Sequence, residues 1–99
     1  ASVCTGAFLL AEAGLLEGIP VTTHWKYIKT LAETYPGLHV EERVKFTDGG
    51  KILTSAGVSA GINLSLYLVG KILGGKAAEE TAREMEFEGD WTKKDGPVL

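Results

Sequence analysis

The sequence is poor in several residue types, and each shortage excludes a class of protein. It has one cysteine and three prolines in 99 residues, and its formal net charge is −3. A single cysteine cannot form an intrachain disulfide, so a disulfide-framed secreted domain is excluded and a reducing, cytoplasmic setting is expected. The acidic balance lacks the basic surface that nucleic acids require. We therefore expect a folded chain that does not bind nucleic acid directly.

Long apolar runs are also missing. The most apolar stretch, residues 62–73, is interrupted by Asn63, Ser65 and Lys71 and is too short to cross a bilayer. One cysteine and two distant histidines match no metal-ligand spacing. The sequence therefore predicts no membrane partner, no metal and no other cofactor.

Helical and strand patterns alternate along the chain. They predict a helix over residues 5–13, a strand over 19–23, a helix over 25–35, hairpin strands over 40–46 and 52–54 around a turn at 48–50, and helices over 62–73 and about 78–85. Apolar residues surround helices 5–13 and 62–73 almost completely, which predicts that both are buried. Thr23 is expected to cap the helix that follows it. The tail from residue 88 shows no periodicity. This alternation is typical of the α/β class.

The only cysteine lies in a strand–turn–helix pattern. Ser2 and Val3 precede Cys4, and Thr5 and Gly6 separate it from the apolar helix. Such a turn can expose a nucleophile, and the backbone N–H groups that follow favour negative charge on a thiolate or an oxyanion. The alternative is that Cys4 is a small buried hydrophobic residue, the commoner fate of a free cysteine. The pattern alone leaves both interpretations open.

Two further features could contribute chemistry. His24 follows the strand over 19–23, where loops of α/β proteins line sites, so it is a candidate base or proton shuttle, although a histidine beside a tryptophan is more often structural. His39, beside a Pro-Gly turn, is expected at the surface. The glycine-rich residues 57–61 lack a dinucleotide or phosphate-loop signature and predict close strand-to-helix packing.

Several segments together resemble the ThiJ/PfpI superfamily, which has the class I glutamine-amidotransferase-like fold. They are residues 2–7 around Cys4, residues 14–18, the Thr-Thr-His-Trp run at 22–25, and residues 49–62. The resemblance extends from residue 2 to about residue 87. It implies the C-terminal half of a flavodoxin-like α/β sandwich, with a nucleophile elbow at Cys4 and a β-hairpin.

The Cys-Thr-Gly and Thr-Thr-His-Trp runs look most like the isonitrile hydratase branch and the sensor domains of AraC-type regulators. The protease-like branch has a histidine after the cysteine, where this chain has Thr5. The resemblance implies a lyase in which Cys4 is the nucleophile, Thr5 supplies hydrogen bonds and His24 lies near the site. It also implies a small-molecule substrate and a homodimer. A ligand sensor without catalysis and a glyoxalase or deglycase-type activity remain alternatives.

The chain departs from the superfamily pattern in two respects. Asn63 stands where relatives typically have an aspartate, which removes a charge near a helix start. The first half of the sheet, with the carboxylate that serves as acid and base in the hydratases, is not in this sequence. We therefore expect residues 1–99 to be the C-terminal half of one domain, as a fragment, a processed chain or part of a split protein. Its N-terminal half would be a necessary partner.

Overall fold

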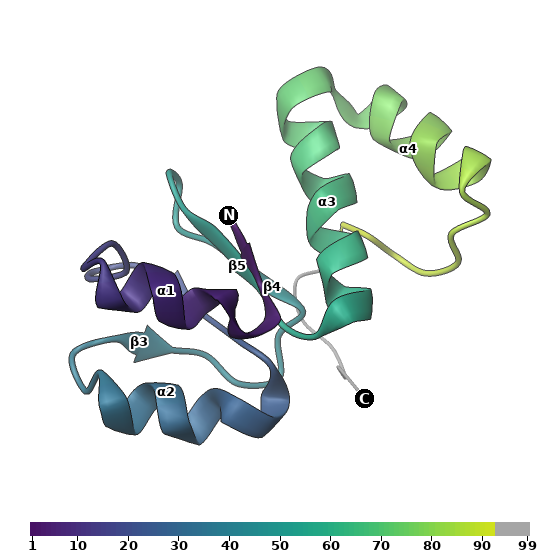
Figure 1. The fold of residues 1–99 in the computed structure, drawn as a ribbon. Coiled ribbons are helices and arrows are strands. Elements are labelled where there is room, and N and C mark those ends of the chain that lie inside the picture. The colour runs from purple at the N-terminus through teal and green to yellow at the C-terminus, as the bar shows by residue number, and fades with distance from the viewer. Residues whose placement is uncertain (93–99) are drawn as a thin grey trace.

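The computed structural model describes residues 1–92, which form short strands between helices (Figure 1). The strands are β1 (Ser2–Val3), β2 (Pro20–Val21), β3 (His39–Val40), β4 (Phe46–Asp48) and β5 (Leu53–Ser55). The helices are α1 (Ala7–Glu12), α2 (Ile28–Thr34), α3 (Val58–Leu73) and α4 (Gly75–Glu84), with 3-10 turns η1 (Cys4–Gly6) and η2 (Trp25–Tyr27). The expected α/β class is confirmed. Residues 93–99 of the predicted aperiodic tail lie outside the described residues.

Two small sheets form the strand layer. In one, β5 lies between β1, which is parallel to it, and β4, which is antiparallel. In the other, β2 and β3 are parallel. The β4–β5 pair confirms the predicted hairpin, but the predicted strand over 40–46 is wrong. Its first residue, Val40, belongs to β3 and pairs with Val21, so the run is divided between the two sheets.

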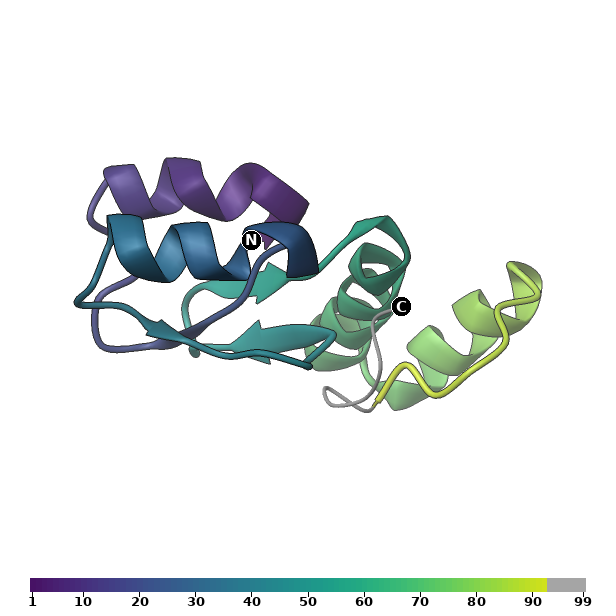
Figure 2. The same ribbon diagram turned by 90° about the horizontal axis from the view of Figure 1, so that it is seen from below.

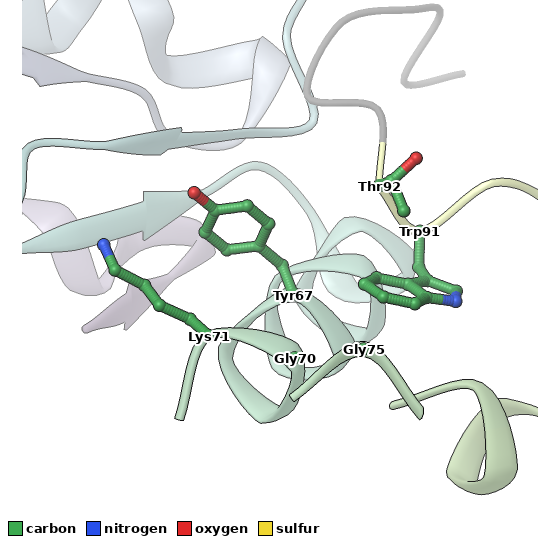
Figure 3. Close-up of a pocket in the computed structure, with 6 residues that line it drawn as sticks. All are labelled: Tyr67, Gly70, Lys71, Gly75, Trp91 and Thr92. Atoms are coloured by element: carbon green, nitrogen blue, oxygen red, sulfur yellow. The ribbon is translucent and has the colours of Figure 1, made fainter. Parts of the chain in front are cut away.

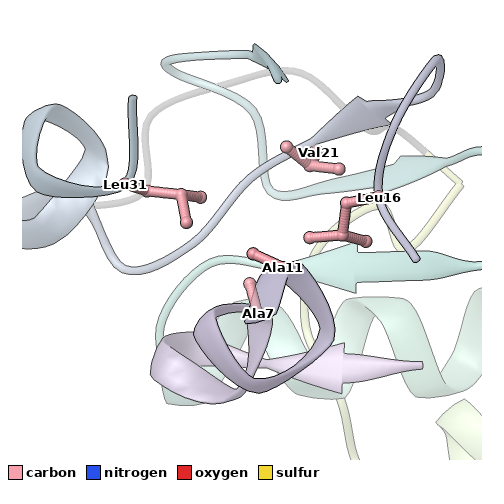
Figure 4. Close-up of a cluster of buried hydrophobic side chains, with 5 residues drawn as sticks. All are labelled: Ala7, Ala11, Leu16, Val21 and Leu31. Atoms are coloured by element: carbon pink, nitrogen blue, oxygen red, sulfur yellow. The ribbon is translucent and has the colours of Figure 1, made fainter. Parts of the chain in front are cut away.

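Helices cover the strands from two sides. Figure 2 shows α1 and α2 side by side along one side of the strand layer. A buried apolar cluster joins these two helices to β2 (Figure 4), and it comprises Ala7, Ala11, Leu16, Val21 and Leu31. A second cluster joins α3 to the hairpin, and it comprises Phe46, Leu53 and Leu64. Because alternate strand residues point to opposite faces, the two clusters fit a strand layer covered on both faces.

Neither predicted apolar helix is buried on all sides. Leu9 in α1 is 76% exposed, and Ile72 and Leu73 at the end of α3 are 72% and 71% exposed. The expectation that these helices lie wholly in the core is therefore wrong. The last helix, α4, buries only Ala78 and Ala82, which confirms its predicted narrow packing face. No helix within residues 1–92 is long and apolar enough to cross a membrane.

Glycine permits the close approach of α3 to the sheet. A Cβ atom on Gly61 would lie 2.9 Å from Cγ1 of Val3, and one on Gly57 would lie 3.3 Å from Cδ2 of His24. Both distances are shorter than ordinary contacts between side chains. The predicted close packing of the glycine-rich segment is therefore confirmed, and this packing holds β1 and the loop with His24 beside the start of α3.

Candidate active site

Cys4 occupies a sharp turn between β1 and the following helices. Its φ angle is +57°, in the left-handed region that non-glycine residues rarely adopt. That conformation costs about 1–2 kcal/mol for a residue with a Cβ atom. The chain passes directly from Val3 in β1 through Cys4 into η1 and then α1. A strained residue between a strand and a helix is the geometry of a nucleophile elbow.

Two hydrogen bonds from other elements hold this turn. The backbone N–H of Cys4 donates to the carbonyl oxygen of Ala56, just after β5, at 3.0 Å. The hydroxyl of Thr23, just after β2, donates to the carbonyl oxygen of Cys4 at 2.7 Å. Thr23 is fully buried and Cys4 is half-buried. The strained backbone of Cys4 is thus restrained on both sides by segments that are distant in sequence.

His24 lies in the loop between β2 and η2. Its Nδ1 accepts a hydrogen bond from the backbone N–H of Lys26 at 3.1 Å, so His24 is the N-cap of η2. The predicted cap at Thr23 is therefore wrong, since the Thr23 hydroxyl donates to Cys4 instead. Because Nδ1 is an acceptor, this bond assigns the proton of a neutral His24 ring to Nε2. The ring can then donate from Nε2.

The same loop contacts Cys4 and His24. Ala56 accepts from the Cys4 N–H, and the next residue, Gly57, packs against the Cδ2 and Nε2 edge of the His24 ring. The ends of β1, β2 and β5 therefore place both predicted residues around one short segment. Thr5, the third predicted residue, is exposed in η1 directly after Cys4. His39 is exposed at the surface, as predicted.

Thr23 contacts the candidate site although its sequence pattern predicted another role. A threonine before a helix has a standard local role as a cap, and that role was assigned to it. Its bond to Cys4 spans 19 residues, so no local pattern indicates it. The only available signal was its position beside His24 in the run that carries the family resemblance.

A pocket of about 320 Å³ lies between the end of α3, the start of α4 and the segment at residues 91–92. It is lined by Tyr67, Gly70, Lys71, Gly75, Trp91 and Thr92 (Figure 3). The pocket shares no residue with the elbow or with the loop that carries His24. Within residues 1–92, no group of three or more His, Cys, Asp and Glu side chains is arranged to hold a metal ion.

Asp48, at the end of β4, binds two of the side chains that line this pocket. Tyr67 donates its hydroxyl to Oδ2 of Asp48 at 2.5 Å, and Nζ of Lys71 lies 2.8 Å from the same oxygen. The hydrogen bonds from Lys71 and Tyr67 lower the pKa of Asp48 to about 2. The bond to Asp48 raises the pKa of Tyr67 in turn. This cluster ties the hairpin to α3.

Residues 1–71 match the model of the DJ-1/PfpI family. The chain belongs to the DJ-1/PfpI family. The family expectation is thereby confirmed. The family match rests on the sequence, whereas the turn at Cys4 is seen in the backbone conformation.

Two curated relatives and one solved structure define the similarity further. The chain is 37% identical over 86 residues to the isonitrile hydratase of Pseudomonas putida, covering 87% of this chain and 36% of that protein. It is 41% identical over 80 residues to the HTH-type transcriptional regulator CdhR of Pseudomonas aeruginosa, covering 81% of this chain and 24% of the regulator. A crystal structure of a ThiJ/PfpI family protein from Pseudomonas syringae superposes with a TM-score of 0.74 at 33% identity, covering 90% of this chain and 36% of that one.

These coverages show that the DJ-1/PfpI chain is a partial domain. It spans about a third of the length of the isonitrile hydratase and of the solved structure. The solved structure also confirms the fold expectation, because the shared part is a mixed α/β arrangement typical of part of a flavodoxin-like fold.

Proposed function

We propose that this chain carries the cysteine nucleophile of an enzyme that hydrates a small isonitrile to an N-substituted formamide. The observation that carries the proposal is the left-handed turn at Cys4, restrained by Ala56 and Thr23. The family membership and the similarity to a protein named isonitrile hydratase support it. Neither a metal nor another cofactor enters the proposal.

The proposed reaction uses the thiolate of Cys4. The sulfur forms a bond to the terminal carbon of the isonitrile, and that carbon takes one proton, which gives a thioimidate. Water then adds to the same carbon, the nitrogen takes a proton, and the carbon–sulfur bond breaks to release the formamide and the thiolate. The sum is the addition of one water molecule to the isonitrile.

Protons must reach the substrate carbon and nitrogen in this scheme. Nε2 of His24 is a candidate shuttle, because the Lys26 bond occupies Nδ1. Thr5, exposed beside Cys4, is a candidate hydrogen-bond donor to the substrate. We place the principal acid, a carboxylate, in a companion segment that forms the N-terminal half of the same domain.

The edge of the sheet supports a companion segment. Within the described residues, β1 pairs with β5 alone and its other edge is open. Val3 in this strand is 45% exposed, and the hydroxyl of the buried Ser2 has no hydrogen-bond partner there. Open parallel edges are normally covered in α/β proteins. We also propose a cytoplasmic setting, in keeping with the single free cysteine, and a homodimer, which the family resemblance implies.

A second candidate function is that of a ligand-sensing domain without catalysis. The 41% identity to the regulator CdhR favours this alternative. A sensor would bind a small molecule in the space beside Cys4 and release it unchanged. Binding without turnover would therefore indicate a sensor, and turnover would indicate an enzyme.

The test is conversion of an isonitrile by the intact protein and by its Cys4→Ala variant. We expect formamide from the wild type and a loss of kcat/KM of roughly a thousandfold or more in the variant, because the bond-forming atom is gone. Formamide is measured by chromatography, and thermal melting of both proteins checks that the variant is folded. Methylglyoxal is offered in parallel to test the glyoxalase or deglycase alternative.

Full activity in Cys4→Ala would refute the nucleophile. Saturable binding of an isonitrile by the wild type without any formamide would favour the sensor instead.

A further inference from the structure

Thr23 reaches the backbone of the elbow from a different part of the chain. It is fully buried, follows β2, and donates its hydroxyl to the carbonyl oxygen of Cys4 at 2.7 Å. Among the described residues, this oxygen is the only hydrogen-bond partner of that hydroxyl. The bond therefore acts on the strained turn and on nothing else.

The carbonyl of Cys4 belongs to the peptide that links Cys4 to Thr5. The described chain contains no cis peptide bonds, so this peptide is planar and trans. In a trans peptide the C=O and the N–H point in opposite directions. A hydrogen bond that fixes the Cys4 carbonyl thus also fixes the direction of the Thr5 N–H. Accepting a hydrogen bond at the oxygen additionally polarises the amide and strengthens its N–H as a donor.

The preceding peptide is held separately. The N–H of Cys4 donates to Ala56 at 3.0 Å, and Ala56 follows β5 rather than β2. Each peptide plane that flanks Cys4 therefore has its own restraint. Loss of the Thr23 hydroxyl would remove this restraint from the Cys4–Thr5 plane and leave the Ala56 bond to the other plane in place.

We propose that Thr23 is a positioning residue for Cys4, whose hydroxyl sets the plane of the Cys4–Thr5 peptide and so aims the Thr5 N–H beside the sulfur. The proposal rests on Cys4 being the nucleophile. Because a backbone N–H near the sulfur stabilises negative charge there, correct aim raises the reactivity of Cys4 as a nucleophile.

Thr22 offers a matched control. It is also buried, lies directly beside Thr23, and donates its hydroxyl to a backbone carbonyl, that of Glu41, at 3.0 Å. Glu41 follows β3 and has no part in the elbow. Thr22→Val and Thr23→Val therefore each remove one buried hydroxyl that donates to a backbone carbonyl, but only the Thr23 hydroxyl donates to Cys4.

The experiment measures the alkylation rate of Cys4 by iodoacetamide against pH in the intact protein, with mass spectrometry of the peptide that carries Cys4. For Thr23→Val we expect a rate at pH 7 lower by about fivefold, the effect of one hydrogen bond, and a profile whose midpoint lies at higher pH. Thr23→Ser should restore most of the rate. Thr22→Val should leave the profile unchanged while it lowers the melting temperature similarly.

An unchanged profile in Thr23→Val, or an equal change in Thr22→Val, overturns the proposal. If Thr23→Val does not fold, Thr23→Ala replaces it and the same criteria apply. The alkylation needs no isonitrile, so its outcome is separate from that of the Cys4→Ala turnover test. A changed profile together with full turnover by Cys4→Ala would leave Thr23 as a determinant of thiol reactivity and reject only the proposed function.

Discussion

Gly61 controls the distance between α3 and the strand that leads into the elbow. It is buried, and a Cβ atom there would lie 2.9 Å from Cγ1 of Val3, the residue before Cys4. The hydroxyl oxygen of Ser55 in β5 would lie 3.8 Å away. Even one methyl group at this position requires α3 or Val3 to shift, because the Val3 side chain is short and β-branched and has little freedom to move aside.

We therefore expect Gly61→Ala to lower the free energy of unfolding by about 1–3 kcal/mol, as overpacking of a core does. Gly75→Ala is the matched control, since Gly75 begins α4 and no atom lies within 4 Å of a Cβ placed there. Alanine at that helical position should be neutral or slightly stabilising. Urea denaturation measures both, and equal effects would mean that β1 and α3 are not closely packed.

The candidate site residues differ in how far their roles could be read from sequence. Cys4 and Thr5 lie in one local strand–turn–helix pattern, which left two interpretations of Cys4 open, and the family resemblance implied the elbow. His24 was predicted near the site, and the structure places it against Gly57. The role of Thr23 was misassigned because capping is local, whereas its hydrogen bond to Cys4 depends on where β2 lies relative to β1.

The hairpin and α3 are joined by the Asp48 cluster. Tyr67 and Lys71 are four residues apart on α3, so both side chains reach the same carboxylate across one helical face. The backbone N–H of Gly50 also donates to Asp48, at 2.8 Å, within the hairpin turn. The side chain of Asp48 is only 10% exposed, whereas that of Lys71 is 43% exposed. The carboxylate is therefore held in its ionised form by donors from two elements.

This cluster predicts a loss of stability in acid. The pKa of Asp48 is lowered from 3.8 to about 2 by the bonds from Lys71 and Tyr67. The stabilisation is complete above the unfolded value and is lost as the pH falls through the folded value. We expect Asp48→Asn to lower the free energy of unfolding by about 1 kcal/mol at pH 7 and to remove part of the decline between pH 4 and pH 2.

Urea denaturation from pH 7 to pH 2 measures this effect. Lys29 and Glu33 form an exposed ion pair on α2, and Glu33→Gln serves as the control because exposed pairs contribute little. If both variants show the same decline in acid as the wild type, the Asp48 cluster does not stabilise the fold.

The sequence predicted helices and strands best where apolar residues recur at regular spacing. The hairpin turn and α2 were found from apolar spacing and glycine signals. The long helix begins at Val58, four residues before the predicted start at 62, because residues 57–61 were interpreted as a connection. The strand over 40–46 was divided because Val40 pairs with β2, and the partner of a strand is not encoded in the strand itself.

Residues 1–92 leave several large apolar side chains exposed. Val58 is 81% exposed, Leu9 is 76% exposed, and Ile72 and Leu73 are also mostly exposed. Single exposed apolar residues are normal in folded proteins. Here the described residues also leave one edge of β1 without a partner strand. Together with the 36% coverage of the isonitrile hydratase, this surface supports a companion segment in the complete domain.

If the proposed function holds, we expect isonitrile turnover by the intact protein and none by the isolated 99-residue polypeptide. The physical reasons are that the proposed function places the principal acid in the companion segment and that the outer edge of β1 has no partner strand among the described residues. Formamide production by equal molar amounts of both is the measurement, and binding of a hydrophobic dye reports the uncovered surface. Comparable turnover by the isolated polypeptide would mean that residues 1–99 already contain the acid.

The amino-acid sequence by itself determined the α/β class, the hairpin, the family and Cys4 as the candidate nucleophile. Each depends on residues close together in the chain, where periodicity, turn chemistry and motif spacing operate. Only the tertiary structure decided that Cys4 takes a left-handed conformation, that Ala56 and Thr23 restrain it, and that His24 lies against Gly57. The reason is that these contacts join the ends of β1, β2 and β5, which are far apart in sequence and meet only when the strands align.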